Sequence, residues 1–265
     1  MYNYHMHTTF CDGKNTAEEM VLSAIEKEMV SIGFSGHGYT EFDQTYCMKD
    51  MIGYMEEVWR LQKKYKNQIQ IYLGVEEDAF APVNRKGFDY VIGSSHYFDK
   101  EGRYLPIDLS NECFKECFAQ FQYDVVSLAE NYYTSFCKYI ANYKPHIIGH
   151  FDLITKFDEV GTSLFLQNPK YNEVAEKYVN IATESNCIFE VNTGAMARGL
   201  RTTPYPSENL LHILKKNGAK ITISSDSHSQ ETLNFGFEDM RQYLYDIGFR
   251  HTYIINQGKF EKISL

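Results

Sequence analysis

"MYNYHMHTTFCDGKNTAEEMVLSAIEKEMVSIGFSGHG", residues 1–38, is the stretch that decides the fold. It holds two strand-like runs, residues 2–7 and 31–35, with a helical pattern between them. Thr16 and Glu19 have the spacing of a capping box, and the apolar residues that follow through Ile25 recur at helical intervals. A strand, a helix and a second strand in this order predict two parallel neighbours in one sheet.

The same alternation continues along the rest of the chain. Strand-like runs cover residues 69–75, 90–93, 146–149, 187–192, 220–224 and 252–255. Helical patterns cover residues 48–66, 111–143, 170–185, 207–216 and 231–245. This alternation predicts a parallel α/β sheet, either doubly wound or closed, and seven or eight repeated units favour a closed, TIM-like barrel. We expect residues 1–265 to form one domain, because a chain of this length can bury one large core.

The composition argues against several classes of protein. A net charge of -9, without a cluster of Lys or Arg, argues against a nucleic-acid groove on the surface. The sequence lacks an apolar run of the roughly 18 residues that cross a bilayer, and its first residues lack the layout of a secretion signal. The six cysteines lack the spacing of zinc ribbons or redox motifs, so we expect reduced thiols in a cytoplasmic protein. Its expected partner is a small molecule, and the sequence leaves its oligomeric state open.

Histidine and carboxylate side chains recur where the predicted strands end. Side chains two residues apart on a strand point to the same face, so His5 and His7 point together, and Asp226 and His228 repeat this spacing. In a parallel barrel the carboxyl ends of the strands converge on one rim. Imidazole and carboxylate groups bind Zn, Mn and Fe. The candidates outnumber the ligands of one ion: His5, His7, His37, Glu76, His96, His150, Asp226 and His228.

Acidic residues of the two stretches 12–13 and 76–78 are candidate ligands. Asp12 follows the first two histidines closely and is a candidate ligand, although "DG" is also an ordinary turn signal. In the run 76–78, strand alternation predicts that Glu76 and Asp78 share the side of the site. The same alternation predicts that Glu77 is solvated.

The order of these motifs resembles the PHP superfamily. From Tyr4 to about His228, the chain carries His-x-His, Asp-Gly, "SGHG", "GVEED", "IGSSHYF", "IIGHFDL" and "SSDSH". The segments "DYVIGSSHYFD" and "EVNTGAMARGLRTTPYPSENLL" are similar to the histidinol-phosphate phosphatase branch of that superfamily. One departure is Cys11, which stands where many relatives have a serine or another polar residue.

The resemblance implies a distorted barrel of seven βα units with three divalent ions, Zn, Mn or Fe, at the carboxyl ends of the strands. It implies hydrolysis of L-histidinol phosphate to L-histidinol and phosphate, a step of histidine biosynthesis, by a hydroxide that bridges two ions. We expect Asp226 and His228 to handle protons in this reaction. The implied ligands are His5, His7, Glu76 and Asp226 for the first ion, Glu76, His96 and His150 for the second, and Asp12, His37 and His228 for the third.

Phosphate binding also needs fixed positive charges. Arg198 follows the sixth strand, the one barrel strand without a predicted metal ligand, and a guanidinium can bind phosphate through two parallel hydrogen bonds. Arg198 is therefore the main candidate for phosphate binding. Arg201 and Lys156 are alternates, and each of these cations could instead be a solvated surface charge.

Two other functions remain open at this point. One is a PHP-type phosphoesterase that acts on a nucleotide or a nucleic-acid end, against which the acidic composition weighs. The other is a non-catalytic, metal-stabilised barrel. Against this second alternative, every candidate ligand position is filled by a side chain that can bind a metal.

Overall fold

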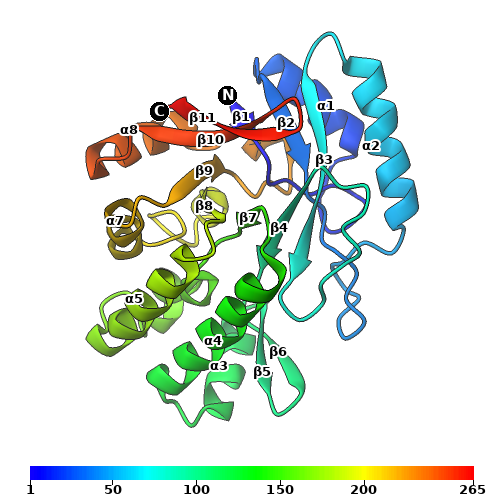
Figure 1. Ribbon diagram of the computed structural model, residues 1–265. Helices are drawn as coiled ribbons and strands as arrows, with labels where there is room; N and C mark the ends of the chain where they lie inside the picture. The colour runs from blue at the N-terminus through cyan, green and yellow to red at the C-terminus, as the bar shows by residue number, and fades with distance from the viewer.

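Seven parallel strands, in the order in which they occur along the chain, form the main sheet of the described residues (Figure 1). The structure is a computed structural model, and it describes residues 1–265 apart from the side chain of residue 162. The strands of this sheet are β1 (Tyr2–Asn3), β2 (Ser31–Phe34), β3 (Gln70–Asp78), β4 (Tyr90–Ser94), β7 (Ile147–Ile148), β8 (Ile188–Asn192) and β9 (Lys220–Ser224). Each strand of this sheet pairs with the next of the seven in chain order, which is the strand order of a parallel barrel.

The first and last strands of this sheet meet just beyond their regular ends. His7 N donates a hydrogen bond to Ser227 O at 2.8 Å, and Ser227 N donates to His5 O at 3.2 Å. Met6 and Ser227 form a parallel bridge between the same segments. The predicted α/β barrel is therefore confirmed as a nearly closed barrel of seven parallel strands, and the contacts that close it lie beside His5 and His7.

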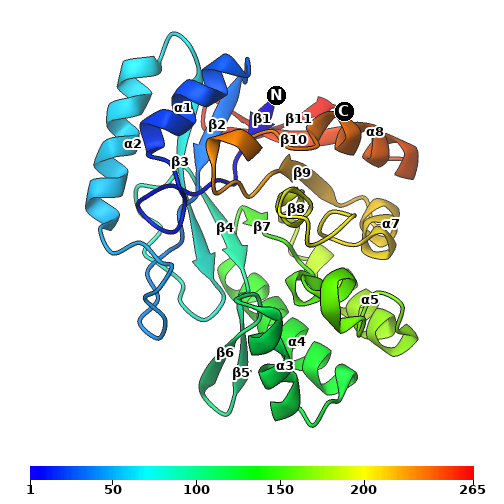
Figure 2. The same cartoon turned by 180° about the vertical axis from the view of Figure 1, so that it is seen from behind.

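The helices are arranged around the strands, as Figures 1 and 2 show. They are α1 (Ala17–Glu26), α2 (Met51–Tyr65), α3 (Asn111–Gln120), α4 (Val125–Tyr143), α5 (Pro169–Thr183), α6 (Gly194–Ala197), α7 (Glu208–Lys216) and α8 (Phe237–Ile247), with short helical turns at Leu153–Thr155, Asp158–Thr162 and Gln230–Thr232. The apolar core lies between strands and helices, for example where Ile32 and Leu73 join one buried cluster with Leu61 of α2. Among the helices of the described residues, none combines the length and the apolar character needed to cross a membrane.

Two of the helix predictions need correction. The predicted helix 111–143 is two helices, because residues 122 and 123 have positive φ angles of 55° and 59°. Asp124 then starts α4 by accepting hydrogen bonds from Val126 N and Ser127 N. The predicted helix 231–245 begins only at Phe237, after Gly236 adopts a φ of 70°. The capping box at Thr16 and Glu19 is confirmed.

The predicted strand over residues 252–255 is not a barrel strand. It belongs to β10 (His251–Asn256), which pairs in antiparallel fashion with β11 (Lys259–Ser264). Ile254 and Ile255 pack in one buried cluster with Tyr4, Tyr72 and Tyr90, and Ile255 N donates to Tyr4 Oη at 3.0 Å. The eighth predicted run therefore packs against residues of the barrel strands instead of extending their sheet.

A second hairpin lies beside α3 and α4 in both views (Figures 1 and 2). Its strands are β5 (Tyr97–Lys100) and β6 (Arg103–Pro106), and their two-residue turn holds Glu101 and Gly102 at positive φ angles of 56° and 80°. Such a turn is typical of tight hairpins. The Phe42 ring packs edge-to-face against Tyr97 and at a tilt against Tyr104, at centroid distances of 4.9 Å and 4.3 Å, so the hairpin packs against the loop that follows β2.

Candidate metal centre

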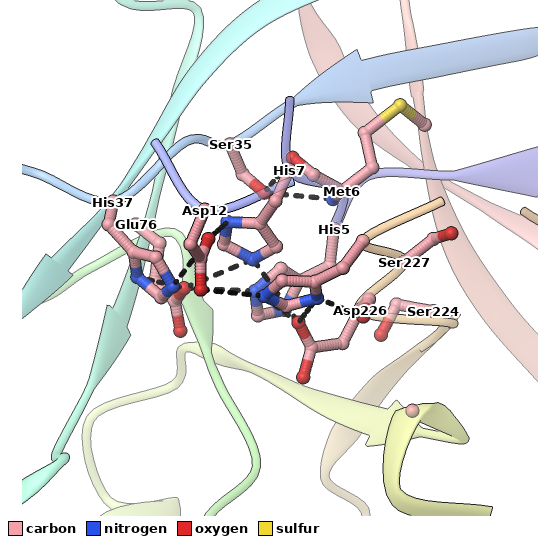
Figure 3. Close-up of polar contacts among 12 residues, drawn as sticks. His5, Met6, His7, Asp12, Ser35, His37, Glu76, Ser224, Asp226 and Ser227 are labelled. Carbon is pink, nitrogen blue, oxygen red and sulfur yellow. Dashed lines mark hydrogen bonds and ion pairs between the residues drawn. The ribbon is translucent and has the colours of Figure 1, made fainter. Parts of the chain in front are cut away.

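The two histidines at the start of the chain lie where the barrel closes (Figure 3). Both side chains are fully buried. Their backbone is held on one side by Ser227, and on the other side Met6 N donates to Ser35 Oγ at 3.0 Å. The two rings therefore project together from a segment that two neighbouring parts of the barrel fix in place.

Four side chains direct one atom each toward a common point (Figure 3). His5 Nε2 lies 3.1 Å from Glu76 Oε2 and 3.5 Å from Asp226 Oδ1, while His7 Nε2 lies 3.5 Å and 3.2 Å from the same two oxygens. Tetrahedral ligands of an ion such as Zn²⁺, at about 2.0–2.1 Å from the metal, are separated by about 3.3 Å. Among the described residues, His5 Nε2, His7 Nε2 and Glu76 Oε2 are buried atoms without a hydrogen-bond partner. Such atoms are rare in proteins, so this set fits a cation.

The second oxygen of Glu76 faces a different pair of histidines. Glu76 Oε1 lies 3.0 Å from His150 Nε2 and 3.5 Å from His96 Nε2, and it accepts a hydrogen bond from Ser94 Oγ. Asp78 lies behind His96, with Oδ2 at 3.2 Å from His96 Nδ1 and 2.9 Å from its backbone nitrogen. The structure therefore puts Glu76 between two sets of nitrogen atoms, and Asp78 on the same side of β3, as alternation predicts.

A third set gathers around Asp12. Asp12 Oδ2 lies 3.2 Å from His228 Nε2, and Asp12 Oδ1 lies 3.6 Å from His37 Nε2. One ring nitrogen of His7 also belongs to this set, in which all donor atoms lie within 4.8 Å of one another. His37 additionally places Nδ1 3.0 Å from Glu76 Oε2, so the third set adjoins the first.

Electrostatics keeps these groups in different charge states. Burial lowers the pKa of His5, but the carboxylates of Glu190, Glu76 and Asp226 outweigh burial and raise this pKa well above its usual value. Burial raises the pKa of Glu76 and of Asp226, yet His5 and further cations around each carboxylate hold both values well below the usual range. Burial and the neighbouring His37 and His228 lower the pKa of His7 to about 3. The ionised carboxylates and the neutral imidazole of His7 are already in the states that a metal ion needs, whereas His5 must release a proton when the ion binds.

A cavity of about 380 Å³ opens over these donor atoms. Arg198 lines it, with Nη2 3.2 Å from Asp226 Oδ2 and Nη1 donating to Asp226 O at 3.3 Å. Lys156 lines it too, and Nζ donates to Asp108 Oδ2 at 3.0 Å and to Asp108 O at 2.9 Å. The structure thus brings two of the three predicted phosphate-binding cations to the cavity that contains the metal-binding atoms.

Arg201 lies elsewhere. It is 4% exposed and donates to the hydroxyls of Thr155 and Thr203, and its guanidinium carbon lies 4.4 Å from the centre of the Tyr205 ring. It is not among the described residues that line the cavity, so the structure does not support its predicted contact with substrate. Its guanidinium is instead placed between the Tyr205 ring and the carboxylate of Glu159, with Nε 4.0 Å from Glu159 Oε1.

Two local predictions are wrong. Glu77, predicted to be solvated, is fully buried and accepts hydrogen bonds from Arg85, Tyr139 Oη and Val83 N. Alternation does separate it from Glu76, but the outer face of a barrel strand is covered by helices rather than by water. Asp226, predicted on an extended segment, has a φ of 46°, which is left-handed backbone.

Two acidic residues of the site do not follow from the sequence patterns. Glu190 of β8 is 1% exposed, and its Oε1 lies 2.5 Å from His5 Nδ1. The signal for it is present, because it is the one charged residue in the buried strand "IFEVN" and buried charges need partners. Asp108 lines the cavity beside Lys156. It follows the β5–β6 hairpin, which the sequence patterns do not predict.

Comparisons with known proteins find one family and relatives that share one name. Residues 3–194 match the sequence profile of the family described as PHP domain. A "Probable histidinol-phosphatase" of Schizosaccharomyces pombe is 27% identical over 96% of this chain and 89% of its own length. A histidinol-phosphatase of Bacillus subtilis is 24% identical over 88% of this chain and 96% of its own length.

A solved structure has the same fold. The histidinol phosphate phosphatase of Lactococcus lactis, crystallised in complex with Zn, L-histidinol and phosphate, superposes with a TM-score of 0.74 at 18% identity. The match covers 98% of each chain. At 18% identity, this superposition shows that the two proteins share the barrel fold.

Proposed function

The chain belongs to the PHP domain family, and on that premise we propose that it hydrolyses L-histidinol phosphate to L-histidinol and phosphate with the help of divalent metal ions. The observation that carries this proposal is the position of Glu76 between two sets of buried histidine nitrogens, under a cavity that also holds Arg198 and Lys156. Relatives with this activity in their names match nearly the whole chain, which supports the substrate. We propose that residues 1–265 act as one domain in this reaction.

The donor atoms suit three ions of the Zn, Mn or Fe type. We assign His5, His7, Glu76 and Asp226 to the first, Glu76, His96 and His150 to the second, and Asp12, His37 and His228 to the third. When bound side by side, such ions lower the pKa of water and neutralise phosphoryl oxygens. The chain supplies the carboxylates that keep these positive charges together.

Proton transfer is assigned to Asp226 and His228. Asp226 lies on the floor of the cavity, and we propose that it accepts the proton of the attacking water. The side chain of His228 is 27% exposed to the cavity mouth, and its Nδ1 is fixed 3.0 Å from Asp226 O. We propose that its Nδ1–H, which points to Asp226 O in this structure, is the group that assists the leaving oxygen of the substrate.

Substrate binding uses charges of both signs. The phosphate is assigned to Arg198 and Lys156. Histidinol phosphate also carries an ammonium group two carbons from its ester oxygen. We assign this group to Asp108, whose carboxylate lies next to Lys156 in the same cavity. The positive Lys156 and the negative Asp108 then face the negative phosphate and the positive ammonium group of the substrate.

Phosphate release tests the proposed substrate. Protein loaded with Mn²⁺ or Zn²⁺ is assayed on L-histidinol phosphate, on a panel of nucleotides and on an aryl phosphate. We expect kcat/KM for L-histidinol phosphate to exceed that for any nucleotide by about tenfold or more. Faster hydrolysis of a nucleotide would replace the substrate, and inactivity on all three classes would favour a non-catalytic barrel.

The proposed setting of the reaction is the cytoplasm. Cys11, Cys47, Cys113, Cys117, Cys137 and Cys187 are all free thiols. Unpaired cysteines are typical of reducing compartments, which supports this setting.

A further inference from the structure

We propose that Glu190 is a positioning residue that orients two histidines of the metal centre, His5 and His150, and thereby links two of its metal sites. Glu190 lies in β8, the one barrel strand without an assigned metal ligand. This inference rests on the metal binding proposed above and is independent of the identity of the substrate.

The carboxylate of Glu190 accepts hydrogen bonds on both oxygens. Oε1 lies 2.5 Å from His5 Nδ1 and also accepts from Ser224 Oγ. Oε2 accepts from His150 N at 2.8 Å and from Asn192 Nδ2 at 2.9 Å. These partners come from the segments after β1 and β7 and from β8 and β9, so one fully enclosed side chain joins four parts of the rim.

The contact with His5 fixes which ring nitrogen carries the hydrogen. A carboxylate only accepts hydrogen bonds, so His5 Nδ1 must be the donor. His5 Nε2, which faces Glu76 Oε2 at 3.1 Å and Asp226 Oδ1 at 3.5 Å, is then the nitrogen that gives up its hydrogen and offers its lone pair when a metal ion binds. A carboxylate behind a histidine in this way orients the ring for metal binding and makes it a stronger ligand.

The contact with His150 acts through the backbone. With its N–H held by Glu190, His150 places Nε2 3.0 Å from Glu76 Oε1. Glu190 therefore supports a nitrogen on each side of the shared Glu76 carboxylate.

The variant Glu190→Gln removes this arrangement while keeping the shape of the side chain. Glutamine has one accepting oxygen and one NH₂ group, so it cannot accept hydrogen bonds from both pairs of donors. In one orientation of the amide, its NH₂ group faces the donors His150 N and Asn192 Nδ2, which then lose their acceptor. In the other orientation, the NH₂ group donates to His5 Nδ1, so the hydrogen of the His5 ring must move to Nε2. Both outcomes weaken metal binding.

Glu77→Gln is the matched control. Glu77 is an equally buried carboxylate in a barrel strand, but it faces Arg85 and Tyr139 instead of the metal centre. Apparent affinities for Mn²⁺ and Zn²⁺ are measured by competition with a chromophoric chelator on each folded, metal-free protein. We expect the affinity of Glu190→Gln to fall roughly 10- to 100-fold and that of Glu77→Gln to stay near the wild-type value.

The outcomes separate this inference from the proposed function. If the wild-type protein binds no metal, the proposed metal centre fails. If the wild type binds metal and Glu190→Gln binds it equally well, or Glu77→Gln loses as much affinity, the role of Glu190 fails.

A second measurement needs no variant that has to fold. Nitrogen-15 NMR of the zinc-loaded wild type should show His5 with a hydrogen on Nδ1 and with Nε2 bound to the metal. A hydrogen on His5 Nε2 would overturn the inference.

Discussion

Adjacent carboxylates on β3 show how much depends on single residues. Glu76 and Glu77 are both buried, yet Glu76 faces the histidines inside the barrel and Glu77 faces Arg85 outside it. Alternation along the strand predicts that the two point apart. What surrounds each side depends on elements far away in the sequence, so the burial of Glu77 could not be predicted from its own strand.

Arg198→Ala tests the main phosphate contact. Loss of a charged, two-point hydrogen bond costs about 1.5–3 kcal/mol. We therefore expect KM for L-histidinol phosphate to rise about 10- to 100-fold with metal content unchanged. Steady-state kinetics and elemental analysis of one preparation check both quantities, and a wild-type KM would remove Arg198 from the substrate site.

Asp108→Asn tests the contact with the substrate ammonium. We expect kcat/KM to fall about tenfold for L-histidinol phosphate but to change little for 4-nitrophenyl phosphate, which has no amine. Lys156→Met is the control, because it should slow both substrates through their common phosphate. Equal losses on the two substrates in Asp108→Asn would contradict the assignment.

Whole elements follow from the sequence to different degrees. The seven barrel strands lie where apolar runs predict them, because six of the seven runs are followed by a helical pattern before the next run begins. The sequence patterns do not predict the β5–β6 hairpin, because its strands are short and partly exposed, although Glu101 and Gly102 form a recognisable turn. The eighth run has the composition of a barrel strand, and only its pairing with β11 shows that it lies outside the sheet.

Glu77→Ala tests how β3 is joined to α4. The change removes the carboxylate that accepts from Arg85 and Val83 N, and the Tyr139 hydroxyl of α4 keeps only its contact with Arg85. Removing one member of a buried ion pair costs about 3 kcal/mol. Urea unfolding of the metal-free protein should show a loss of this size in the free energy of unfolding, and a loss below about 1 kcal/mol would mean that the link is weak.

At the scale of the whole molecule, the barrel brings together side chains that are far apart in the sequence. His5 and Asp226 are separated by most of the chain. Even so, His5 Nε2 lies 3.5 Å from Asp226 Oδ1, because the segments that follow β1 and β9 meet where the barrel closes. The candidate ligands could be predicted because each lies near the carboxyl end of a strand or in the segment that follows it. Their grouping depends on the closure of the barrel. Glu190 is marked in the sequence as the one charged residue of an apolar strand, whereas the place of Asp108 in the cavity becomes visible only in the fold.

Metal binding should strengthen as pH rises. Burial lowers the pKa of His96, but Glu76 and Asp78 outweigh it and raise this pKa from 6.5 to about 9. Without metal, the stability from this proton is fully present below pH 6.5 and is lost as pH rises through about 9. A metal ion must displace the proton of His96 in order to bind. The stabilisation that the metal adds should therefore increase as pH rises.

The increase in Tm on adding Mn²⁺ measures this effect. We expect the increase to be larger near pH 8 than near pH 6. Metal-free protein at each pH is the reference. An increase that is constant, or that shrinks as pH rises, would contradict the assignment of His96 as a ligand.

Anomalous X-ray diffraction from crystals of the metal-loaded protein tests the central claim most directly. We expect peaks at the three donor sets, with one peak on either side of the Glu76 carboxylate and a third between Asp12, His37 and His228. A cavity without anomalous peaks under metal-replete conditions, or peaks only outside these donor sets, would contradict the account.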